Sequence, residues 1–192
     1  HFRADADLRG KWVLRGEPAL VDSTSPRLRE KATYYSAVCL ETGEVEEMEP
    51  EGNCTAATSA AFLRQLRANH AEPLVVIWDN GPAHRGEPIR EFLATPGLNL
   101  RLVPLPGYSP DYNADEAIWD WAREEVTGNV CLGTKAKVEE KMAPFFKCLA
   151  NQAEEVKRRC RTALQAQADA LTMTAAGYAE QPTHVDLTLG LV

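Results

Sequence analysis

Two acidic clusters follow segments that the sequence predicts to be β-strands. In VVIWDNGPAH, residues 75–84, an apolar run leads directly into Asp79. A second cluster, in the predicted turn after residues 98–105, contains Asp111, Asp115 and Glu116. If the two strands are neighbours in a βαβ unit, their carboxyl ends meet at one edge of the sheet, where open α/β sheets bind ligands. Converging carboxylates repel each other and therefore need a shared proton or a cation.

Carboxylate oxygens favour Mg²⁺ or Mn²⁺ over zinc as the cation. The five cysteines are scattered along the chain without a CxxC motif, so neither a disulfide framework nor a zinc site is indicated. We therefore expect free thiols and, if a metal is present, a hard divalent cation.

The elements that would position these acids follow from periodicity and turn residues. Residues 34–49 predict an antiparallel hairpin, and residues 12–21 either another strand pair or an extended excursion. The remaining expected elements are a helix at 55–70, strands at 74–78 and 98–105, a helix at 87–94, and helical structure from 114 to about 171. This order indicates an α/β fold with a mixed sheet flanked by helices and a C-terminal helical extension. We expect one domain over residues 1–171 and a weakly structured tail over 172–192.

Composition limits the class of protein. The chain has 192 residues, 44% of them hydrophobic, which is enough for one domain with a substantial core. Its formal net charge of −7 argues against nonspecific binding of polyanions, so a nucleic-acid partner would need a local basic patch. The sequence has neither an apolar run of membrane-spanning length nor a signal-peptide pattern, and a cytoplasmic protein is expected.

The two motifs together resemble the catalytic core of DDE-type transposases of bacterial insertion sequences, in the mariner-like superfamily. WDNGPAHR, residues 78–85, resembles the strand that ends in Asp-Asn before Ala-His-Arg in that family. LPGYSPDYNADEAIW, residues 105–119, resembles the Pro-Tyr-Ser-Pro-Asp-x-Asn turn with its following Glu and Trp. The likeness extends over residues 1 to about 165 through the Trp12 segment and the LETGEV hairpin, while Ala114 replaces a usual proline.

The resemblance implies a ribonuclease H-like fold and metal-dependent cleavage and joining of DNA strands. It assigns Asp79 as the second catalytic acid and Glu116 as the third, both as ligands of a site for two Mg²⁺ or Mn²⁺ ions. The implied partners are transposon-end and target DNA, with a homodimer as the functional assembly. The family's first Asp belongs to a strand expected before His1, with Asp5 and Asp7 as the only early substitutes. Little nuclease activity is therefore expected from this chain by itself.

Several of these residues also have a structural interpretation. Asp79 could end its strand through turn chemistry with the following Asn and Gly. Glu116 could belong to a capping box with Asn113, and Asp111 and Asp115 could be turn and first-turn acids beside the helix dipole. Trp119 and Trp121 are expected to pack in the core.

Contacts with DNA phosphate are expected from His84 and Arg85 in the loop after residue 78 and from the KRRCR segment, residues 157–161. The alternative for His84 is an ordinary hydrogen-bonding role, and the alternative for KRRCR is a solvated helix face. The candidates are His84, Arg85, Lys157, Arg158 and Arg159. Two other functions stay open: an inert transposase-derived binding or dimerisation module, and a hydrolase or phosphoacceptor with Asp79 as nucleophile.

Overall fold

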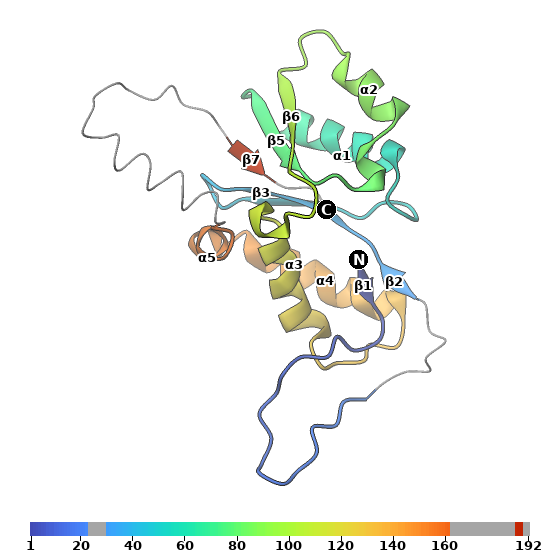
Figure 1. The fold of residues 1–192 in the computed structure, drawn as a ribbon, viewed down its shortest axis with the longest axis vertical. Helices are drawn as coiled ribbons and strands as arrows, with labels where there is room; N and C mark the ends of the chain where they lie inside the picture. Colours follow the sequence, from blue (N-terminus) through green and yellow to red (C-terminus); the bar gives the residue numbers. More distant parts are fainter. Residues whose placement is uncertain (23–29, 162–186, 190–192) are drawn as a thin grey trace, which may run out of the picture.

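A mixed five-stranded sheet forms the centre of the protein (Figure 1). The computed structural model describes residues 1–22, 30–161 and 187–189. The strand order is β4-β3-β7-β5-β6. The strands are β3 (Tyr35–Cys39), β4 (Val45–Met48), β5 (Leu74–Trp78), β6 (Leu100–Pro104) and β7 (Leu187–Leu189). Strands β3 and β4 form the predicted antiparallel hairpin, and β5 pairs in parallel with both β6 and β7. A separate antiparallel pair joins β1 (Phe2–Arg3) to β2 (Lys31–Ala32).

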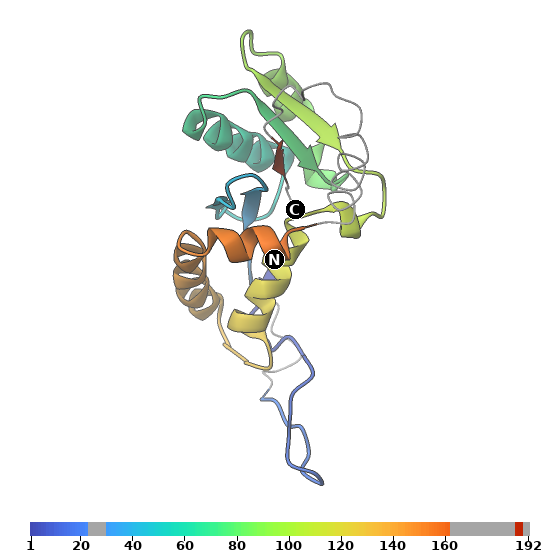
Figure 2. The same cartoon turned by 90° about the vertical axis from the view of Figure 1, so that its left-hand side faces the viewer.

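Helices cover both faces of the sheet, as the two views show (Figure 1, Figure 2). One face carries α1 (Ala56–Asn69) and α2 (Glu87–Leu93), and the other carries α3 (Glu116–Ala122), α4 (Lys135–Leu149) and α5 (Ala153–Arg159). Side chains along β3 point to opposite faces of the sheet and so contribute to two separate cores. Tyr35 and Ala37 pack with α1 and α2, whereas Val38 belongs to the core with α3 to α5.

Short irregular turns connect these elements near the ends of the strands. They are the 3₁₀ turns η1 (Pro82–His84) and η2 (Pro110–Tyr112) and the π-helical segment η3 (Arg123–Thr127), which continues α3. The start of α1 is fixed by Thr55, whose side chain accepts a hydrogen bond from the Thr58 amide in a reciprocal capping box. The predicted order of hairpin, helix, strand, helix, strand and helix is confirmed.

The prediction of a weakly structured tail is wrong for residues 187–189. These residues form β7, which lies between β3 and β5 and satisfies backbone groups of both strands. The predicted domain boundary at 171 and the helical extension beyond 161 lie outside the described residues.

The segment 8–22 is an extended excursion without strands, one of the two predicted alternatives. It projects away from the sheet and helices, drawn in blue in Figure 1, and exposes Leu8, Trp12, Leu14 and Leu20. Among the described helices, none is long and apolar enough to cross a membrane.

Candidate active site

Asp79 and Glu116 line the same cleft, which has a volume of about 430 Å³. The parallel pairing of β5 and β6 aligns Trp78 with Pro104, so both strands end at the same edge. Asp79 follows β5 directly, and the chain from β6 returns through η2 to Glu116 at the first position of α3. The sequence-predicted convergence of the two strand ends therefore brings these carboxylates to one cavity.

The turn after β5 holds Asp79 in a defined orientation. The Gly81 amide donates to Asp79 Oδ1 over 2.6 Å, and Nε2 of His84 lies 3.3 Å from the same oxygen. Asn80 ties the end of β5 to the end of β6 by donating its side-chain amide to the Leu105 carbonyl. The turn chemistry expected for Asp79 is thus present, and it coexists with the position of Asp79 in the cleft.

Glu116 is partly buried and surrounded by charge. Burial is the main cause that raises the pKa of its carboxyl above the ordinary value. The Arg123 guanidinium opposes this shift, whereas the Asp120 and Asp79 carboxylates reinforce it. Because the Asp79 and Glu116 carboxylates repel each other, a bound cation would stabilise their ionised forms.

The capping box weighed as the structural alternative for Glu116 does not form. Helix α3 begins after Asp115 without a side-chain capping bond, and the Asn113 side chain instead accepts from the Asp115 amide over 3.2 Å. Because the Asn113 side chain is used in this turn and Asp115 takes the N-cap position, the Asn-x-x-Glu spacing does not form a reciprocal capping box. Glu116 lines the cleft and takes no part in a cap.

Asp115 is not the solvated first-turn acid that the sequence suggested. Its side chain is fully buried, and Oδ2 accepts a hydrogen bond of 2.5 Å from the Ser36 hydroxyl on β3. Oδ1 has no partner among the described residues, and burial raises the pKa of this carboxyl to about 8. No signal in the sequence connects Ser36 with Asp115, because their contact depends on packing of β3 against α3. The predicted burial of Trp119 and Trp121 is confirmed.

The expected DNA contacts divide into three cases. Arg85 is exposed and lines the cleft, where its guanidinium donates to the Asn80 carbonyl. His84 is buried, with 7% of its surface exposed, so a phosphate contact does not suit it and the DNA-binding assignment is corrected. Its ring packs on Trp78 instead, with 4.7 Å between centroids.

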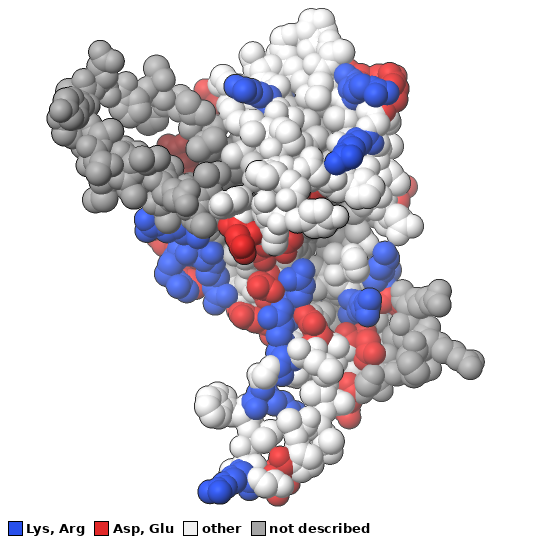
Figure 3. All heavy atoms as spheres, in the orientation of Figure 1, with Lys and Arg blue, Asp and Glu red and all other residues white. Residues whose placement is uncertain are grey.

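The basic residues of α5 are engaged by neighbouring acids. Lys157 pairs with Glu154, and Arg158 and Arg159 both pair with Glu155. Figure 3 shows Lys and Arg side chains gathered beside α5. Because the acids lie on the same short helix, they reduce the positive potential that a phosphate would meet.

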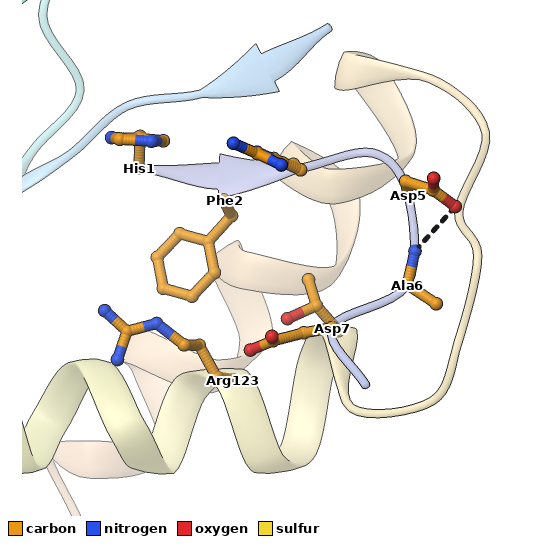
Figure 4. A pocket seen from close by; sticks show the side chains of 8 residues that line it. His1, Phe2, Asp5, Ala6, Asp7 and Arg123 are labelled. Carbon is orange, nitrogen blue, oxygen red and sulfur yellow. Dashed lines mark hydrogen bonds between the residues drawn. The ribbon is translucent and has the colours of Figure 1, made fainter. Parts of the chain in front are cut away.

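Asp5 and Asp7, the possible substitutes for a first acid, lie at a different cavity. This second cavity, of about 210 Å³, is lined by both acids together with Arg123 and Thr127 and shares no lining residue with the Asp79 cleft. Figure 4 shows Asp5 turned back to accept from the Ala6 amide. Neither acid therefore joins Asp79 and Glu116.

The donor set of the cleft fits a hard divalent cation in chemical type. Asp79 and Glu116 supply carboxylate oxygens, the ligands that Mg²⁺ and Mn²⁺ prefer. Among the described residues, no group of three or more His, Cys, Asp or Glu side chains could hold a metal ion. Asp79 and Glu116 are therefore the residues of the cleft that could supply carboxylate ligands to such a cation.

Comparisons with known proteins identify the family and the fold of the chain. Residues 1–138 match the family model described as DDE superfamily endonuclease. The insertion element IS630 uncharacterized 39 kDa protein of Shigella sonnei is 27% identical over 138 residues, which cover 70% of this chain and 39% of that protein. A chain in the crystal structure of the Mos1 strand transfer complex is similar with a TM-score of 0.53 and 17% identity, covering 83% of this chain and 51% of that chain.

The mixed sheet flanked by helices is similar to that of the Mos1 chain, and the expected ribonuclease H-like fold class is confirmed. The chain belongs to the DDE superfamily endonucleases. Its predicted kinship with the transposases of bacterial insertion sequences is confirmed as well. It spans about two fifths of the IS630 relative and half of the Mos1 chain.

Proposed function

We propose that this chain forms the catalytic domain of a transposase that cleaves and joins DNA strands at transposon ends with the help of divalent cations. The observation that carries the proposal is the placement of Asp79 and Glu116 in one cleft, with the Asp79 charge acting on the Glu116 carboxyl. Membership in the DDE endonuclease family supports the reaction class.

In the proposed mechanism the carboxylates of Asp79 and Glu116 would hold Mg²⁺ or Mn²⁺. When bound, the metal ions supply Lewis acidity for an in-line phosphoryl displacement by water or a 3′ hydroxyl. The Gly81 amide fixes one oxygen of Asp79, which reduces the motion that would separate the acid from its partner. Partial burial of Glu116 limits access of water to its carboxylate and strengthens its interaction with a cation.

DNA is the proposed partner, with a pair of chains as the working assembly. Arg85 is the cation best placed to contact a phosphate, because it is exposed and lines the cleft with Asp79. The similarity to a chain of a strand transfer complex supports a DNA partner. The identity of the first catalytic acid stays a prediction, since Asp5 and Asp7 line another cavity.

Strand cleavage of a transposon-end duplex in Mg²⁺ tests this function. We expect cleavage by a longer transposase chain that contains these residues, a loss of at least about 100-fold in its Asp79→Asn and Glu116→Gln variants, and little change in Asp111→Asn. Asp111 is the matched control because it is an exposed acid five residues before Glu116 and does not line the cleft. Cleavage that persists in both cleft variants would show that these acids do not carry the reaction, whereas no Mg²⁺-dependent cleavage by the unaltered protein would favour the alternative of an inert binding module.

A further inference from the structure

A chain of polar side chains runs through the interior from β3 to the carboxylate of Asp79. The Tyr35 hydroxyl lies 3.0 Å from Oγ of Ser59, and Ser59 Oγ lies 3.4 Å from Nδ1 of His84. Nε2 of His84 then lies 3.3 Å from Asp79 Oδ1. Three different parts of the fold contribute: β3, α1 and the turn after β5.

One assignment of donors and acceptors in this chain leaves a donor facing Asp79. In this assignment the tyrosine hydroxyl would donate to the serine oxygen, and the serine hydroxyl would donate to Nδ1 of the imidazole. A neutral ring that accepts at Nδ1 carries its proton on Nε2, which faces the anionic oxygen of Asp79.

Packing fixes the orientation of the His84 ring. The His84 side chain is 4% exposed and lies against the Trp78 indole, with the Tyr35 ring on a neighbouring side. Ser59 is fully buried in α1, and Tyr35 has a second partner in Thr58 at 2.9 Å. The imidazole therefore has little freedom to rotate away from the carboxylate.

Both contacts to Asp79 fall on the same oxygen. Gly81 and His84 approach Oδ1, and no described residue donates to Oδ2. A second hydrogen-bonded shell of this kind orients carboxylate ligands of metals in proteins.

We propose that His84 is a positioning residue that holds Oδ1 of Asp79 through Nε2, with Ser59 and Tyr35 fixing the protonated nitrogen, so that Oδ2 faces the cation. This inference deepens the proposed function and rests on it for the identity of the cation. Its structural part, the tautomer and the orientation of the ring, can be measured in the protein without metal.

The first test is nitrogen-15 NMR of the histidine side chains, with the His84 signals assigned by their loss in His84→Gln. We expect His84 to be a neutral ring with its proton on Nε2. Ser59→Ala removes the donor to Nδ1 and should give a mixture of tautomers, whereas Ser109→Ala, a serine of the cleft without contact to His84, should change nothing. A wild-type ring protonated on Nδ1, or an unchanged single tautomer in Ser59→Ala, would overturn the proposal.

The second test is the affinity for Mn²⁺, measured from the electron paramagnetic resonance signal of the free ion. His84→Phe keeps an aromatic ring but has no donor and should bind Mn²⁺ about tenfold more weakly. His84→Gln places an amide donor near the position of Nε2 and should restore most of the affinity. Equal affinities of wild type and His84→Phe, with both folded by circular dichroism, would contradict the positioning role.

The two tests separate failure of this inference from failure of the proposed function. If the wild-type protein and Asp79→Asn bind Mn²⁺ equally poorly, the proposed metal site is wrong, and the tautomer measurement alone then decides whether His84 orients Asp79. If Mn²⁺ binds in an Asp79-dependent way and His84→Phe is indistinguishable from wild type, only the inference about His84 fails.

Discussion

The Ser36 hydroxyl lies 2.5 Å from a carboxyl oxygen of Asp115, which joins the centre of β3 to the residue before α3 across 79 positions of the sequence. This contact anchors the beginning of the helix that carries Glu116. It also places an acid inside the core, where burial raises its pKa from 3.8 to about 8.

The buried carboxyl of Asp115 predicts an unusual dependence of stability on pH. Because its pKa is raised, the folded state binds this proton more tightly than the unfolded chain does. Its contribution to stability is complete below pH 3.8 and is lost as the pH rises to about 8. Asp115→Asn should remove this part of the slope, measured by urea unfolding at pH 5, 6, 7 and 8. An Asp111→Asn control should retain the slope, and an unchanged slope in Asp115→Asn would show that Asp115 is ionised in the fold.

Gly81→Ala is expected to impair catalysis more than folding. A Cβ atom at Gly81 would lie 2.9 Å from Asp79 Oδ1 and 3.1 Å from the His84 ring, so the carboxylate must shift. The backbone conformation at Gly81 is accessible to alanine, with φ of −53°, and thermal stability should change little. We expect cleavage to fall by about 10- to 100-fold.

Gly107→Ala is the control for that experiment. Gly107 lines the same cleft, but nothing lies within 4 Å of an added Cβ, so activity and stability should both remain near wild type. Equal effects of the two alanine variants would mean that the position of Asp79 is not critical.

The basic residues should separate into a DNA contact and a structural contact. Arg85→Ala removes an exposed charge from the cleft and should weaken DNA binding, with the slope of log affinity against log salt concentration reduced by about one. Arg159 lies 4.3 Å over the Trp121 ring, so Arg159→Ala should instead lower the free energy of unfolding by about 1 kcal/mol. Fluorescence anisotropy over a salt series and urea unfolding measure the two effects. A larger loss of DNA affinity in Arg159→Ala than in Arg85→Ala would reverse these assignments.

The sequence predicted those parts of the fold whose signals are local. The apolar run before Asp79, the alternation of residues 98–105 and the helix start at Thr55 are each readable within a dozen residues, and all three elements formed. Strand β7 was missed because a three-residue strand is defined by its two partners, β3 and β5, which lie far away in the sequence.

The same distinction applies to the site. The two strand ends predicted that Asp79 and an acid of the second cluster share one edge of the sheet, whereas the choice of Glu116 among those acids came from the resemblance to DDE transposases. The burial of Asp115 and His84 could not be predicted, since it depends on Ser36 and Ser59 approaching from other elements. Local spacing also left a cap open as an alternative for Glu116, but the Asn113 side chain accepts from the Asp115 amide instead.

Calorimetric titration of Mn²⁺ into Asp79→Asn, Glu116→Gln and the double variant tests most directly whether these two acids share a cation. If they do, each single variant should lose most of the binding free energy, and the double variant should lose little more, because removing either ligand already breaks the shared site. Binding that is unchanged in both single variants, or losses that add independently, would contradict the central claim that Asp79 and Glu116 form one metal site.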